Sequence, residues 1–139
     1  MLFNVPADIS LLRAQVQADI DHQVSQARAL FITLIPGQEA VHALKLREAQ
    51  LIAADPQQGA NVSEGETPHI TAEAAEHEVS RFEKAVEILS RDQHWVVGSQ
   101  MIERIRRSAK AVLAAATTAP EIRAAAKIDW LDVRAYALA

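Results

Sequence analysis

The sequence predicts an all-α protein, and three observations lead to this prediction. Apolar residues recur every three or four positions over most of the chain, which is the spacing of one face of a helix. Alanine is the commonest apolar residue, and only four of the 139 residues are glycine. That composition favours helix over sheet. In full, we predict an antiparallel helical hairpin, a long helix, a short capped C-terminal helix and an extended tail.

The first helix is expected between residues 9 and 31, where Leu12, Val16 and Ile20 begin an apolar stripe. Pro6 lies near its start, and Pro36 and Gly37 lie just beyond its end, where they block continuation. A second helix is expected over 38–54. Because the connection is short, the two helices are predicted to form an antiparallel hairpin over 7–54.

The segment 55–70 is polar and contains glycine and proline, so we predict one long loop there. A helix over 72–116 follows, and it would be about 65 Å long if unbroken. That exceeds the width of a compact domain of this mass, so we expect a break between Trp95 and Ser99 or packing against other chains. Residues with the spacing of a heptad seam run along this helix, and all of them except Gln93 are apolar: Val79, Phe82, Val86, Leu89, Gln93, Val96, Ile102, Ile105, Ala109, Val112 and Ala116.

A short helix over 119–127 is predicted from the capping box that Thr118 and Glu121 form, with Pro120 in the first turn. Residues 131–139 are expected to form an extended tail. The domain prediction is therefore a single helical domain over 1–130 followed by this tail.

Composition restricts the chemistry. The chain has no cysteine, which excludes thiol catalysis and Cys-ligated zinc. Its net charge of -4 argues against a broad basic face for nucleic acid. The N-terminus lacks the pattern of a signal peptide, and no stretch approaches the roughly 18 apolar residues of a membrane helix. We therefore expect synthesis in a cytoplasm and no membrane insertion.

Two local clusters are candidate sites. Glu73 and His77 are four residues apart and could hold one side of a metal ion, but no second pair of ligands is spaced to complete the site. We expect a solvated helix face there, with no metal, cofactor or catalytic residue, and keep a small enzyme or metal-binding bundle as an alternative. The other cluster is basic and could contact phosphates or pair with Glu76, Glu83 and Glu87; it consists of Arg104, Arg106, Arg107 and Lys110.

The candidate partner-binding residues lie mostly at the C-terminus: Trp130, Leu131, Val133, Tyr136 and Leu138, with Arg104 and Arg107 on the long helix. The tail is apolar and lies outside any capped helix, so we expect it to attach to a partner. The alternative is that Leu131, Val133 and Leu138 fold back onto the chain's own helical hairpin. Trp130 fits an intermolecular contact nearly as well as an internal one.

Several short motifs between about residues 20 and 130 resemble a group of small bacteriophage tail proteins, which are related to the uncharacterised C-terminal domain of some tail-fibre proteins. These motifs are Ala27-Arg28-Ala29-Leu30-Phe31-Ile32-Thr33, Pro36-Gly37-Gln38, Lys45-Leu46-x-Glu48-Ala49, Ala54-Asp55-Pro56, Trp95, Ile102, Arg106, Lys110-Ala111, Ala114 to Thr118, Glu121 and Asp129-Trp130.

This resemblance implies a non-enzymatic structural component of a virion tail or its fibre apparatus, made in the bacterial host cytoplasm. It also implies attachment to tail or tail-fibre proteins. We further expect self-association through the apolar seam as a homo-oligomer, with a trimer as one candidate, because small residues let helices approach closely and the long helix requires partners. The alternative from another class is a tail-fibre assembly chaperone that is absent from the mature virion.

Overall fold

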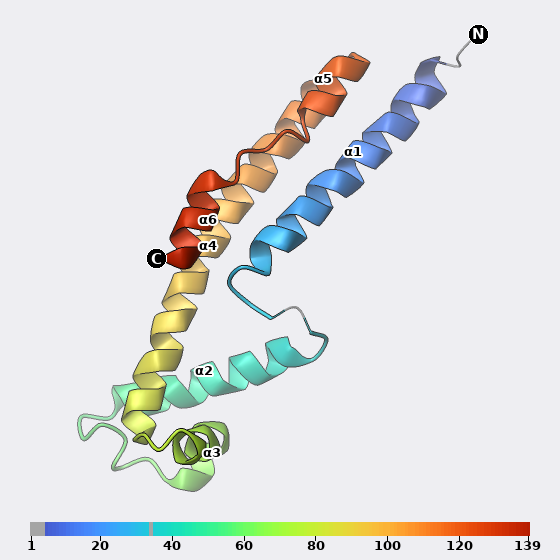
Figure 1. Cartoon of the computed structure of the whole chain (residues 1–139). Coiled ribbons are helices and arrows are strands. Elements are labelled where there is room, and N and C mark those ends of the chain that lie inside the picture. The colour runs from blue at the N-terminus through green and yellow to red at the C-terminus, as the bar shows by residue number, and fades with distance from the viewer. Residues whose placement is uncertain (1–4, 34) are drawn as a thin grey trace. The chain divides into compact units, whose positions relative to one another are not determined.

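The computed structural model describes residues 5–33 and 35–139. Every regular element in these ranges is helical, which confirms the all-α prediction. The elements are α1 (Val5–Arg28), α2 (Gln38–Ala54), the 3-10 helix η1 (Glu64–Glu66), α3 (Pro68–Glu76), α4 (Arg81–Ala115), α5 (Ala119–Ala124) and α6 (Leu131–Leu138), shown in Figure 1.

The chain divides into two compact units. Unit 1 consists of the described residues up to Ile32 together with Val97–Ala139, and unit 2 consists of the described residues of Thr33–Val96. The 35-residue helix α4 contributes its first half to unit 2 and its second half to unit 1. Helix α1 belongs to unit 1 and α2 to unit 2, so the predicted hairpin of these two helices, and the single domain over 1–130, stay predictions.

Unit 1 is built on α1 and the second half of α4, which run antiparallel (Figure 1). Arg28 pairs with Glu103 at 3.1 Å, and Asp21 pairs with Lys110 at 3.0 Å, so the chain numbers rise on one helix as they fall on the other. Apolar side chains fill the interface between the two helices because both present an apolar stripe at helical spacing. The buried members are Val16, Ile20, Val24 and Ala27 on α1 and Ile102, Ala109 and Leu113 on α4.

The C-terminal segment completes unit 1, and Gln23 on α1 holds it in place. The side-chain amide of Gln23 donates to the carbonyl of Ala126 at 2.9 Å and accepts the indole N–H of Trp130 at 2.9 Å. Ile122 of α5 and Val133 of α6 are fully buried. The segment after α4 is therefore part of the core of unit 1.

Unit 2 has its own core, formed by Ala49, Ile52, Ile70 and Ala85, with Phe82, Ile88 and Leu89 packed against it. Helix α2 packs on α3. The buried carboxylate of Glu48 on α2 accepts the backbone N–H of Ile70 at 3.0 Å, in the first turn of α3. A carboxylate is favoured there because the first amides of a helix lack backbone partners and carry partial positive charge.

The predicted long loop is ordered by two side chains. Asp55 accepts backbone N–H groups from Gln57, Gly59 and Asn61 at 2.9–3.2 Å. The side-chain amide of Asn61 also donates to Asp55. This bond has the largest effect, and together with the backbone bonds it lowers the pKa of Asp55 below its usual range. From the other side, the guanidinium of Arg81 donates to the carbonyls of Gly59 and Val62 at 2.8 Å. The loop is thus attached to the start of α4.

The break in the predicted 72–116 helix occurs at 77–80, and the expectation of a break between Trp95 and Ser99 was wrong. Glu78 has a left-handed backbone, with φ of 55°, which ends α3. Ser80 and Glu83 then form a capping box: the Ser80 N–H donates to the Glu83 carboxylate at 3.1 Å, and the Glu83 N–H donates to the Ser80 hydroxyl at 3.0 Å. The loop is correspondingly shorter than 55–70, because α3 begins at Pro68.

The heptad seam holds only in part. Ile102, Ala109 and Ala116 are buried, but Val86 and Val112 are about half exposed. The buried stripe of the second half of α4 passes instead through Gly98 and Leu113, because that face meets α1. The heptad spacing therefore predicts helical structure correctly here, but Val86 and Val112, which belong to the predicted seam, are not buried.

The short helix begins as predicted, with the Thr118 hydroxyl accepting the Glu121 N–H, but it ends at Ala124 and not at residue 127. The tail over 131–139 is not extended: it forms helix α6. The Asp129 carboxylate accepts the Leu131 N–H at 2.9 Å just before the helix. Val133, Tyr136 and Ala137 turn inward, which is the i, i+3, i+4 pattern of a helix.

Candidate functional site

The predicted partner-binding residues of the C-terminus separate into an inward and an outward set. Trp130 is 8% exposed and its indole is bonded to Gln23, while Val133 is fully buried. Tyr136 packs its ring against Phe31, with centroids 6.1 Å apart. These three residues hold α6 on unit 1. Of the residues named in the fold-back alternative, Val133 is buried, whereas Leu131 and Leu138 are exposed.

The outward set consists of Leu131 and Leu138, which are 68% and 89% exposed. They lie seven residues apart on α6, two turns of helix, with the exposed Arg134 between them. Because Val133 and Tyr136 are held inward, the direction of this outer face is defined. The attachment interpretation therefore applies to Leu131 and Leu138 only.

Arg104 and Arg107 are exposed on the second half of α4, as a partner-binding role requires. Their neighbour Glu103 pairs with Arg106 at 3.3 Å and reaches Arg107 at 4.0 Å. Within unit 1 this basic cluster pairs with Glu103 and Asp21. Its alternative pairing with Glu76, Glu83 and Glu87, which belong to unit 2, stays a prediction. In the described part of the chain no ion pair involves Arg104.

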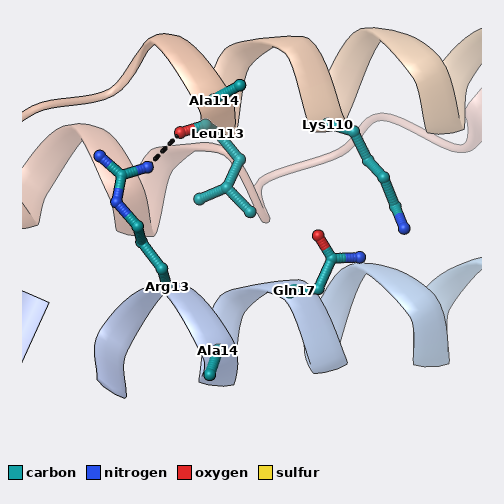
Figure 2. Close-up of a pocket in the computed structure, with 6 residues that line it drawn as sticks. All are labelled: Arg13, Ala14, Gln17, Lys110, Leu113 and Ala114. Carbon is teal, nitrogen blue, oxygen red and sulfur yellow. Dashed lines mark hydrogen bonds between the residues drawn. The ribbon is translucent and has the colours of Figure 1, made fainter. Parts of the chain in front are cut away.

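An open hollow of about 370 Å³ lies between α1 and the end of α4 (Figure 2). Arg13 points across it and donates to the carbonyl of Leu113 at 2.7 Å and to that of Ala116. The Leu113 carbonyl lies in the last turn of α4, where it also accepts the Ala116 N–H at 3.3 Å, and Ala116 directly follows the helix, so the guanidinium caps this helix end. Lys110 is paired with Asp21, to which Gln17 also donates. The lining, which Ala14 and Ala114 complete, contains no hydroxyl, imidazole or carboxylate.

The Lys110 ammonium holds the pKa of Asp21 below its usual range of about 3.8, with help from the amide of Gln17. A carboxyl with a lowered folded pKa contributes stability above its unfolded pKa, and this contribution is lost as the pH falls through the folded value. Asp21→Asn is therefore expected to flatten the decline of stability below pH 4, with a small effect at pH 7 because the side chain is half exposed. Urea unfolding at pH 3 and pH 7 measures this. If the free energy of unfolding falls between pH 7 and pH 3 by the same amount in Asp21→Asn as in the wild type, the ion pair would be contradicted.

Glu73 and His77, the two candidate metal ligands, contact different side chains. Glu73 pairs with Lys45 at 2.6 Å, and His77 Nδ1 lies 2.6 Å from the ammonium of Lys84. Lys84 is 3% exposed and also donates to Glu87 at 2.8 Å, which lowers the pKa of Glu87. Across residues 5–33 and 35–139, no three His, Asp or Glu side chains are grouped to hold a metal ion.

The sequence interpretation missed the side chains that build these surfaces. Gln23, Arg13 and Arg81 each bond to groups at least 14 residues away, so no local spacing signals them. The buried Lys84 was missed as well, although its place one turn after the capping serine could have marked it as inward-facing. A local motif such as the Thr118 and Glu121 box predicts where a helix begins. It does not predict which distant side chain, such as Arg13, bonds to a helix end.

No protein-family model, curated protein or solved structure matches this chain. Within the described ranges, no helix has the length and apolar character needed to cross a membrane.

Proposed function

We propose that this chain is a non-enzymatic structural component of a bacteriophage tail or its fibre apparatus, acting by helix-mediated self-association and attachment to a tail partner. The proposal starts from the resemblance of its sequence motifs to small tail proteins. The observation that supports an attachment role is the outer face of α6, where Leu131 and Leu138 are exposed on a helix that buried residues hold in place. Exposed leucines spaced by two turns are typical anchors for a facing helix or groove.

The runner-up is an assembly chaperone for a tail fibre, which would use the same exposed face on an unfinished partner. Mass spectrometry of purified particles from the phage that encodes the chain separates the two. Recovery at a copy number stoichiometric with a known tail protein supports the structural component. Absence from the particles, with the chain bound to fibre protein in the lysate, would support the chaperone.

The attachment face is tested by the double substitution Leu131→Ser with Leu138→Ser. Because both side chains are exposed, we expect the free energy of unfolding to change by less than about 0.5 kcal/mol each. Incorporation into particles, measured by quantitative mass spectrometry, is expected to fall at least about tenfold, as loss of two interface anchors does.

Leu11→Ser is the matched control, because Leu11 is 60% exposed on α1 and far in sequence from α6. It should be incorporated normally. Normal incorporation of the α6 double variant would show that this face is not the attachment surface. Deletion of 131–139 is a poorer test, because it also removes the buried Val133.

A further inference from the structure

The two units have opposite net charges. Unit 1 contains nine Lys and Arg against seven Asp and Glu, a net charge of +2. Unit 2 contains five basic and eleven acidic residues, a net charge of -6. A chain with this asymmetry attracts a second copy when unit 1 of one copy approaches unit 2 of the other.

Within unit 1, the exposed face of α6 has a defined pattern, which we call the basic strip. It consists of Leu131, Arg134 and Leu138, at positions i, i+3 and i+7. The two leucines are 68% and 89% exposed. An arginine therefore lies between two apolar anchors about 10 Å apart along the helix.

Within unit 2, the start of α4 and the chain just before it have the opposite pattern, which we call the acidic strip. It consists of Val79, which precedes the helix, and of Glu83 and Val86 on α4. Val79 is 38% exposed and Val86 is 48% exposed, and Glu83 is exposed between them in sequence. The order is again apolar, charged, apolar, but the charge is negative, and the helical spacing covers only Glu83 and Val86, at i and i+3.

On each helix an apolar residue lies three positions from the charged one, before Arg134 on α6 and after Glu83 on α4, so these pairs match when the two helices run antiparallel. Leu131 then lies opposite Val86 and Arg134 opposite Glu83, with Leu138 toward the end of the strip that holds Val79. In a parallel arrangement the arginine and the carboxylate are one residue out of register. Antiparallel pairing also sets opposite ends of the two helix dipoles side by side.

We infer that the basic strip on α6 of one copy docks antiparallel on the acidic strip of a second copy of the chain. The occupant is argued from charge: the strip on α6 is basic, and the complementary strip is present on the same chain in its acidic unit. Every copy has both strips, so the contact can form more than once in an assembly. Each contact is small, so we expect weak, reversible and salt-sensitive association.

This inference rests on the self-association in the proposed function, but the two fail separately. A chain that is present in purified particles and monomeric in solution would overturn the inference and leave the structural role standing. A chain that associates through the two strips but is absent from particles would support the inference and overturn the structural role.

The test is sedimentation equilibrium of the full chain at 50 mM and 500 mM NaCl. We expect reversible association that weakens at high salt. Arg134→Glu places two carboxylates together and should raise the dissociation constant at least about tenfold at low salt. The matched control is Arg47→Glu, because Leu44, Arg47 and Leu51 repeat the spacing of the basic strip on α2, with an exposed arginine.

The decisive arm mixes two variants. Glu83→Arg alone should also weaken association, because Arg134 then faces a cation. An equimolar mixture of Arg134→Glu and Glu83→Arg chains restores an opposite-charge pair at each contact between unlike copies. We therefore expect mixed species near the wild-type affinity and little association of either variant alone.

Circular dichroism checks that the variants fold, since Glu83 also caps α4 through Ser80. If Glu83→Arg unfolds, Glu83→Gln keeps an acceptor for the Ser80 N–H and removes only the charge, and it should weaken association by a few-fold. A monomeric wild type, or an Arg47→Glu effect equal to that of Arg134→Glu, would overturn the assignment. So would the failure of two folded charge-reversed variants to associate on mixing.

Discussion

Arg81→Ala is expected to destabilise unit 2 by about 3 kcal/mol, because the substitution leaves several acceptors without their charged donor. The guanidinium binds the carbonyls of Gly59 and Val62 at 2.8 Å and the hydroxyl of Thr67 at 2.9 Å. Thr67 is fully buried, so water cannot replace the lost bond there without opening the loop. Arg81→Lys should be intermediate, because an ammonium lacks the planar fork that reaches two carbonyls and a hydroxyl together.

Unfolding in urea, followed by tryptophan fluorescence, measures this effect in the right unit. Trp95 belongs to unit 2 and Trp130 to unit 1, so a Trp130→Phe background leaves Trp95 as the reporter. Arg91→Ala is the matched control, since Arg91 lies on the same helix with its side chain 79% exposed and paired with Glu87. Its effect should stay below about 0.5 kcal/mol. Equal effects of Arg81→Ala and Arg91→Ala would show that the loop does not depend on Arg81.

The sequence predicted the helices well because their signals are local. Periodic apolar residues and the Thr118 and Glu121 box lie within a few residues of the structure that they specify. Ser80 and Glu83 carry the same capping signal, and its recognition would have placed the start of α4 correctly. The range in which a break was expected, Trp95 to Ser99, lies inside the continuous helix α4.

The candidate site was harder to predict, because exposure depends on which face of a helix is covered. In residues 131–139 the apolar side chains fit an alternating pattern as well as a helical one, so the extended tail and α6 could not be separated by periodicity. Contact of Tyr136 with Phe31 and of Trp130 with Gln23 decides the outcome. Each of these contacts joins residues about a hundred positions apart, and no local pattern reports such a distance.

Gly98→Val is expected to destabilise unit 1 by about 3 kcal/mol, at the upper end of the cost of overpacking a core. A Cβ atom at Gly98 would lie 2.5 Å from a ring carbon of Phe31, far inside van der Waals contact. Turning the ring away would disturb its packing against Tyr136. The close approach of the Phe31 ring therefore accounts for a glycine in the middle of α4.

Gly98→Ala gives the sharper test, because helix propensity and packing predict opposite signs. In an exposed helix the change from glycine to alanine stabilises by about 1 kcal/mol. Against Phe31 the added methyl should cost more than this gain, so we expect net destabilisation in urea unfolding followed by Trp130 in a Trp95→Phe background. In a Phe31→Ala background the ring is absent, and the same Gly98→Ala substitution should become stabilising. The double-mutant cycle isolates the contact; a stabilising effect of Gly98→Ala in both backgrounds would show that the ring does not press on the α4 backbone.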